Sequence, residues 1–115
     1  MDERVRNAVC ESVFKIIHEE DCIIFLFGSY VTGEQTGFSD IDIGILGRLP
    51  IPAKDFLAIQ EKLKDTMPTL RKIDLVDFNS ISEKVKKEAL QGTQIWHIGK
   101  NCRELLKFLK PPHKN

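Results

Sequence analysis

The sequence predicts an α/β (α+β) fold, in which a small mixed β-sheet of three to four strands has helices packed on it. Two observations predict it. Stretches with apolar residues at helical spacing alternate along the chain with short stretches rich in β-branched and aromatic residues. Hydrophobic residues are 42% of the total and charged residues 30%, which is typical of a globular protein. We expect one domain over residues 1–115, with its core at about 5–98.

The first half of the chain predicts one helix and two strands. Residues 3–19 carry apolar side chains at helical spacing. Residues 22–27 are a continuous apolar run that ends at a glycine, which predicts a buried central strand. Residues 28–39 contain three glycines and predict a loop, with a short helical turn after Ser29. Residues 40–46 alternate polar or small with apolar side chains and predict a strand with one polar face.

The second half predicts helix, strand, helix, strand and helix in that order. A helix begins after Pro50 and Pro52 and ends before Pro68. Ser80 and Glu83 have the spacing of a capping box and open another helix. The remaining elements are expected at residues 72–78, 80–90, 95–98 and 102–110.

The connection between the first two strands limits the topology. It has only 12 residues, which is close to the minimum for a crossover between parallel strands. We therefore expect the first two strands to be antiparallel, in a mixed sheet with helices on one side.

Charge and cysteine content exclude several classes of protein. Seventeen basic residues balance seventeen acidic ones, which argues against direct nucleic-acid binding. No apolar run is long enough to span a membrane, and no signal sequence is visible, so we expect a cytoplasmic protein without membrane association. The three cysteines form no C-x-x-C pair, so we expect neither a disulfide framework nor a zinc site.

Asp40 and Asp42 are the first candidate site residues. At positions i and i+2 of a strand, both carboxylates project from the same face, with Cα atoms about 6.5–7 Å apart. Two carboxylates this close repel each other unless a cation lies between them. Mg²⁺ is the natural cation, because it binds one or two carboxylates together with phosphate oxygens.

Gly28 and Ser29 form the second candidate feature, a turn where a buried strand ends. A glycine lets a triphosphate approach the backbone closely, and Ser29 adds a hydroxyl and amide groups. Each feature alone is common, but this turn and the Asp40–Asp42 pair are rarely found together.

Asp74, in the third apolar strand, completes the candidate site. Aspartate is depleted in strands and costly to bury unpaired. If the second and third strands are neighbours, Asp74 can join the other two carboxylates, and three carboxylates can hold two Mg²⁺ ions. Asp77 is the alternative, but its position suits the entry to the next helix.

These residues resemble the DNA polymerase β nucleotidyltransferase superfamily, and above all its minimal (MNT) branch. The likeness is carried by the segment FGSYVTGEQTGFSDIDIGIL and supported by KIDLVDF. The resemblance implies a polymerase β palm-like fold and transfer of AMP, or another nucleoside monophosphate, from ATP to an acceptor hydroxyl. It implies that Gly28 and Ser29 bind the triphosphate, that Asp40 and Asp42 hold two Mg²⁺ ions, and that Asp74 binds the catalytic ion and assists acceptor deprotonation.

The chain departs from this family in one respect. Many relatives have a basic residue soon after the Gly-Ser, whereas Tyr30, Val31 and Thr32 occupy the turn here. Neutralisation of the triphosphate then depends more on the metals.

The acceptor is expected to come from another protein, because few residues follow the matching region. The resemblance implies an antitoxin that adenylylates a HEPN-type toxin. Two alternatives stay open: a nucleotide-binding module that neutralises a partner by contact, and an aminoglycoside-type transferase completed by oligomerisation, for example as a homodimer. The apolar stripe at 105–109 and Trp96 are interpreted as core.

Overall fold

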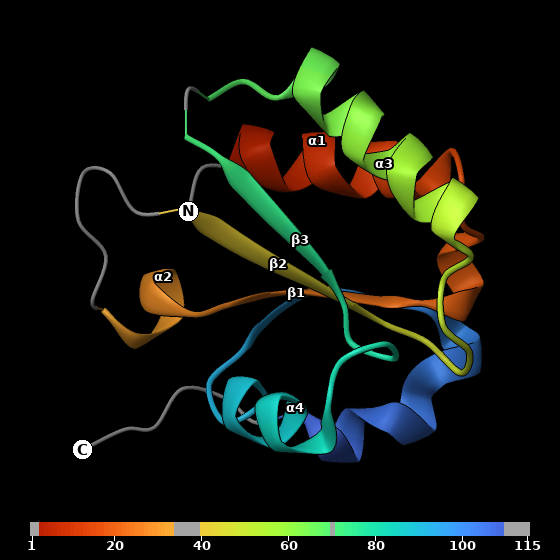
Figure 1. The fold of residues 1–115 in the computed structure, drawn as a ribbon, viewed down its shortest axis with the longest axis vertical. Coiled ribbons are helices and arrows are strands. Elements are labelled where there is room, and N and C mark those ends of the chain that lie inside the picture. The colour runs from red at the N-terminus through yellow and green to blue at the C-terminus, as the bar shows by residue number, and fades with distance from the viewer. Residues whose placement is uncertain (1–2, 34–39, 70, 110–115) are drawn as a thin grey trace.

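The computed structural model describes residues 3–33, 40–69 and 71–109. Figure 1 shows a central sheet with helices above and below it. The elements, in chain order, are α1 (Glu3–Phe14), the 3₁₀ helix η1 (Glu19–Asp21), β1 (Ile23–Phe27), α2 (Ser29–Thr32), β2 (Ile41–Leu46), α3 (Ala53–Thr66), β3 (Ile73–Asp77), α4 (Glu83–Ala89), β4 (Gln94–Ile98) and the 3₁₀ helix η2 (Lys100–Phe108).

The sheet is mixed, with the strand order β3-β2-β1-β4. β1 is antiparallel to both β2 and β4, and β2 is parallel to β3. The predicted mixed sheet and its antiparallel first pair are therefore confirmed.

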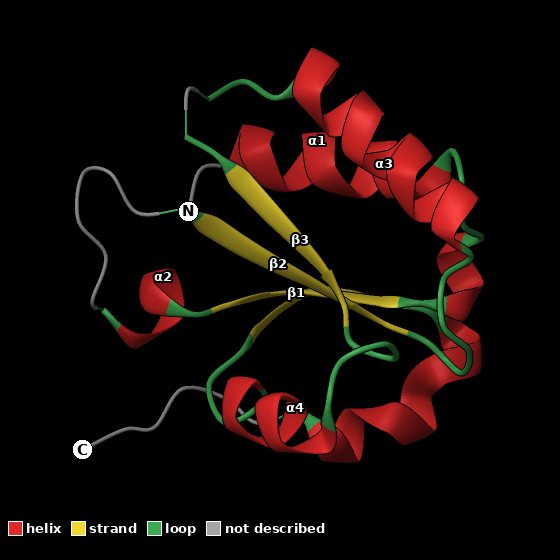
Figure 2. Ribbon diagram, viewed as in Figure 1, coloured by secondary structure: helices red, strands yellow, loops and turns green. Residues whose placement is uncertain are grey.

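Helices cover both faces of the sheet, with α1 and α3 on one face and α4 and η2 on the other (Figure 2). The expectation that helices lie on one side was wrong. In β1, Ile24 and Leu26 pack under α1 and α3, whereas Ile23 and Phe25 pack toward α4 and η2. A continuous apolar run is typical of a strand buried on both faces, and residues 22–27 already carried that signal.

The polar face predicted for residues 40–46 is also much smaller than expected. Within β2 every residue is buried except Asp42, which is half-buried. Gly44, which was counted as small and polar-facing, lies against the rings of Phe25 and Phe78. These rings pack edge to face with centroids 4.8 Å apart, so the aromatic side chains fill the space that a larger residue would have occupied.

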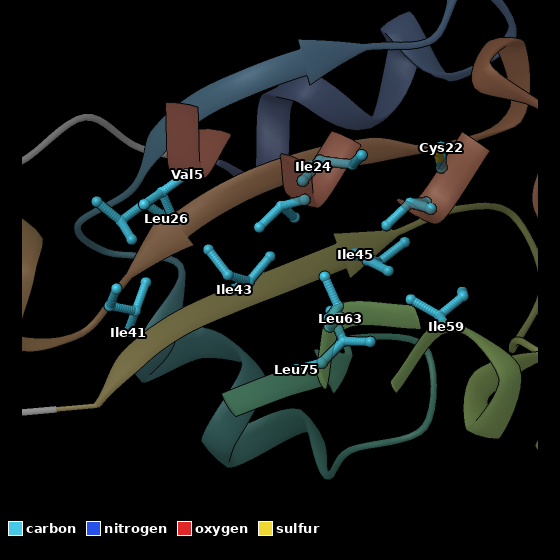
Figure 3. Close-up of a cluster of buried hydrophobic side chains, with 12 residues drawn as sticks. Val5, Cys22, Ile24, Leu26, Ile41, Ile43, Ile45, Ile59, Leu63 and Leu75 are labelled. Carbon is cyan, nitrogen blue, oxygen red and sulfur yellow. The ribbon is translucent and has the colours of Figure 1, made fainter. Parts of the chain in front are cut away.

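The larger core cluster lies between the sheet and the pair α1 and α3 (Figure 3). Three valines of α1 and two residues of α3, Ile59 and Leu63, pack onto alternate residues of the strands. The first helix ends at Phe14 and not at residue 19, because the amides of Ile16 and Ile17 both donate to the Val13 carbonyl, at 3.0 and 2.8 Å. That tight turn brings the chain back to the start of β1.

Two helices in the second half differ in detail from the expectation. α4 begins at Glu83 and is capped by Ser82, whose hydroxyl oxygen accepts a hydrogen bond from the Val85 amide at 3.3 Å. The predicted Ser80–Glu83 capping box is therefore wrong, because Ser80 donates its hydroxyl to Asp77 instead.

The last helix is a 3₁₀ helix over Lys100–Phe108 and not an α-helix over 102–110, whose final residue lies outside the described part. Cys102 and Leu109 are buried, and Leu105 and Leu106 pack against them. The apolar stripe is thus core, as predicted, apart from Phe108, which is 46% exposed. None of the described helices is long and apolar enough to cross a membrane.

Candidate active site

The candidate site lies where β1 ends and where β2 and β3 begin. In the antiparallel register Phe27 lies opposite Asp42, and in the parallel register Asp42 lies opposite Asp74. The strand pairing therefore places the Asp42 carboxylate between the end of β1 and the third carboxylate. Asp40 directly precedes β2.

Side-chain alternation sets the face on which these carboxylates lie. Ile41 and Ile43 point into the cluster under α1 and α3, as do Ile73 and Leu75. Their neighbours Asp42 and Asp74 therefore project from the opposite face, the one that carries α4. The condition set for a joint site, that the second and third strands be neighbours, is fulfilled.

The negative charges of Asp40 and Asp74 act on Asp42. The pKa of Asp42 is raised, first by burial and then by the negative charges of Asp74 and Asp40. Asp40 and Asp74 are exposed, whereas Asp42 is half-buried. A cation placed beside Asp42 would relieve both the desolvation and the repulsion.

Gly28 is required by its conformation and by its contact with Asp42. Its φ of +79° lies in the left-handed region, which disfavours side chains. A Cβ atom there would overlap Oδ2 of Asp42 and lie 3.1 Å from its Cγ. The glycine thus makes room for the carboxylate, a role that sequence reasoning did not find. Its role in letting a triphosphate approach the backbone stays a prediction.

The turn after Gly28 is a single helical turn, as predicted. Ser29 begins α2, and the Val31 amide donates to the Gly28 carbonyl at 3.0 Å. The position of the Ser29 hydroxyl lies outside the described part of the structure. The sequence interpretation of that hydroxyl as a phosphate ligand stays a prediction.

Arg71 lies beside the turn of the candidate site, and sequence reasoning missed it. Its guanidinium carbon lies 5.6 Å from the centroid of the Tyr30 ring, in a cation–π contact. Tyr30 belongs to α2, so a positive charge is held beside the turn that lacks a basic residue of its own. No local signal marks Arg71, because its position depends on the way β3 starts beside β2.

Asp77, the alternative to Asp74, has a structural role. Its buried carboxylate accepts hydrogen bonds from the Ile51 amide (2.8 Å), the Asn79 amide (3.0 Å) and the Ser80 hydroxyl (2.8 Å). These bonds fix the loop before α3 and the turn after β3. All of its observed partners are amide and hydroxyl groups of neighbouring loops and turns. Asp74, in contrast, is exposed beside the other two carboxylates.

The donor set fits Mg²⁺. Carboxylate oxygens are hard ligands, and Mg²⁺ is usually bound by one or two carboxylates, water and substrate phosphates, not by an all-protein cage. Within the described residues, no three His, Cys, Asp or Glu side chains close around a point as a ready metal site. Asp40, Asp42 and Asp74 are the residues that would hold such an ion, which would supply positive charge beside a triphosphate.

The sequence is similar to that of a known protein adenylyltransferase. MntA, a protein adenylyltransferase of Shewanella oneidensis, is 35% identical over 75 residues, which are 64% of this chain and 52% of the relative. The chain thus spans about half the length of that relative.

Solved structures agree on the fold. A chain of a toxin–antitoxin crystal structure with AMP-PNP is 26% identical, with a TM-score of 0.69 over 90% of this chain and 82% of the other. A chain of the tri-AMPylated HEPN toxin in complex with the MNT antitoxin of Shewanella oneidensis shares the fold at 23% identity. Its TM-score is 0.68, over 94% of this chain and 83% of the other.

Residues 11–100 match the family described as polymerase beta nucleotidyltransferase. That range includes the turn at Gly28, the three carboxylates and all four strands. The chain belongs to the polymerase beta nucleotidyltransferase family.

Proposed function

We propose that this protein is a Mg²⁺-dependent protein adenylyltransferase, which transfers AMP from ATP to a hydroxyl group of a protein acceptor and releases pyrophosphate. One observation carries the proposal: Gly28 contacts Asp42, and Asp42 lies opposite Asp74 in the sheet. The name of the relative MntA and the AMP-PNP in the related toxin–antitoxin structure support ATP as the donor.

Each residue then has a distinct role. Backbone amides at Gly28 and Ser29 bind the triphosphate, and Arg71 adds positive charge at α2. Asp40 and Asp42 are the ligands for two Mg²⁺ ions, and Asp74 shares one of them and orients the acceptor hydroxyl. Bound Mg²⁺ supplies charge neutralisation of the triphosphate and a lowered pKa of that hydroxyl. The protein contributes mainly positioning and fixed charge.

We infer that the acceptor is a HEPN-type toxin and that this chain is its antitoxin. The toxin–antitoxin complexes among the solved structures support this partner. The reaction belongs in the cytoplasm, which holds ATP and keeps thiols reduced, and the three cysteines of this chain are free.

Labelled ATP tests the proposal. The protein is incubated with Mg²⁺, ATP labelled in the α-phosphate and a HEPN-type protein. Label is expected on that protein with the wild type and none with the Asp40→Asn, Asp42→Asn double variant. Asp65→Asn, an exposed aspartate of α3 outside the site, is the matched control and should transfer label normally.

Three results would contradict parts of the proposal. A stable complex without transfer of label overturns the enzymatic role and leaves a module that acts by contact. Label on a low-mass acceptor, in the absence of a second protein, supports the small-molecule transferase. Full activity of the double variant refutes the assignment of the carboxylates.

A further inference from the structure

β3 is an edge strand, and its outer side carries main-chain groups that point away from the sheet. The Ile41 amide donates to the Lys72 carbonyl, and the Phe78 amide donates to the Ile45 carbonyl, each at 2.9 Å. In a parallel strand the amide and carbonyl of one residue point to the same side, and the side alternates along the strand. The main-chain groups of Ile73 and Leu75 therefore point outward.

A groove of about 410 Å³ runs along this edge, between β3 and α3. In Figure 1, α3 lies near β3, over the face of the sheet that also carries α1. Ile73, Asp74 and Leu75 line the groove from the strand, and Leu57 and Lys64 line it from the helix. Leu57 is 58% exposed, so the groove offers an apolar contact along the strand that carries Asp74, whose side chain projects from the other face of the sheet.

The groove carries an excess of one basic residue over its acidic residues. Lys64, Arg71 and Lys72 line it, against Glu61 and Asp74. A segment with acidic residues beside its hydroxyl would be complementary to this surface. A nucleic acid would present phosphates to the two carboxylates and has no alternating amide and carbonyl groups for the strand edge.

We propose that this groove binds an extended, acidic segment of the acceptor protein, which adds to the outer edge of β3 as a further strand. The main-chain groups of Ile73 and Leu75 pair with the segment, and Lys64 contacts its acidic side chains. Addition of a strand to an exposed edge is a common mode of peptide binding. The hydroxyl of the segment then lies beside Asp74. The inference rests on the proposed function, because it takes the acceptor to be a protein.

Amide exchange measured by NMR on the whole chain tests the proposal. The probe is the synthetic peptide valine–glutamate–tyrosine–glutamate–valine, whose tyrosine lies on the face of Asp74 and whose two glutamates lie on the opposite face, toward Lys64. At saturation, exchange at Ile73 and Leu75 should slow by roughly tenfold or more, whereas Asp74 and Val76, which already face β2, should change little. Two further peptides carry N-methyl groups, one on both glutamates and the other on the tyrosine. The peptide whose N-methyl groups replace amide hydrogens that pair with β3 should not bind. The peptide whose N-methyl groups point away from β3 should bind like the parent.

Charge reversal provides a second test. Lys64→Glu should weaken binding of the peptide roughly fivefold, and Lys54→Glu, an exposed lysine of the same helix outside the groove, should leave it unchanged. The proposal is overturned if Ile73 and Leu75 gain no protection, or if both N-methylated peptides bind.

Other occupants of the groove would overturn the proposal as well. Protection that grows with protein concentration alone would indicate a second copy of this chain. The same protection with a single-stranded RNA oligonucleotide would indicate nucleic acid. None of these measurements needs ATP or Mg²⁺, so failure of AMP transfer and failure of peptide binding are separate outcomes.

Discussion

Replacement of Gly28 by alanine tests the site most directly, because one methyl group has two separable effects. The first is backbone strain, since φ is +79° and a side chain in this region costs about 1–2 kcal/mol. The second is overlap of the new Cβ with Oδ2 of Asp42, which forces the carboxylate to move by about 1 Å. A displacement of that size at a reacting centre can cost roughly a hundredfold in rate, or about 2.7 kcal/mol.

Gly33→Ala is the matched control. Gly33 has a similar φ of +85°, but among the described residues no atom lies within 4 Å of a Cβ built there. Both variants should therefore lose similar stability, seen as a fall in Tm of roughly 4–8 °C for each kcal/mol. Only Gly28→Ala should lose AMP transfer as well.

The assay combines thermal unfolding with initial rates of label transfer at a temperature where both variants are folded. Equal transfer rates for the two variants would refute the reasoning, because the contact with Asp42 would then have no consequence for the reaction. A Tm of Gly28→Ala far below that of Gly33→Ala would show that the overlap is relieved by the backbone and not by the carboxylate.

Three further predictions concern stability. The pKa of Asp42 in the folded protein is raised above 3.8. The stability that protonation of Asp42 contributes is therefore fully present below pH 3.8 and is lost as pH rises through the folded-state pKa. Asp42→Asn should therefore exceed the wild type in Tm at pH 7, and the gap should close below pH 3.8 in a pH series of thermal melts. Asp77→Ala leaves three donors without their acceptor and should lower the free energy of unfolding by about 3 kcal/mol. Asp74→Ala should abolish AMP transfer with little change in Tm. The reverse pattern would mean that Asp77 is the site residue and Asp74 the structural one. Gly44→Ala forces a Cβ into the ring of Phe25 and to 2.7 Å from the ring of Phe78, so urea denaturation should show a loss of about 2 kcal/mol.

The sequence predicted the strands well, because their hydrophobic patterns are local. The four observed strands begin and end within about two residues of the predicted ranges, as is usual for such boundaries. The antiparallel pairing of β1 and β2 followed from the short connection alone. The length of the connection and the types of residue in each strand were enough to predict these features.

What the sequence could not predict depends on contacts between distant segments. Arg71 lies beside Tyr30 only because β3 starts next to β2. Ser80 does not cap α4, because the buried carboxylate of Asp77 accepts its hydroxyl hydrogen bond. The second layer of helices was missed because the alternation in residues 40–46 was interpreted as solvent exposure, although Gly44 faces two aromatic rings.

The position of β1 in the sheet has a consequence for the order in which the fold forms. β1 can pair with β2 soon after both strands are synthesised. Its other edge pairs with β4, where Ile23 lies opposite Ile98. At the pace of translation, about seventy residues of further synthesis take several seconds or more. During that time the most apolar strand has one unpaired edge, which is the kind of surface that aggregates. Docking of β4, and not the pairing of β1 with β2, should therefore limit productive folding of the nascent chain.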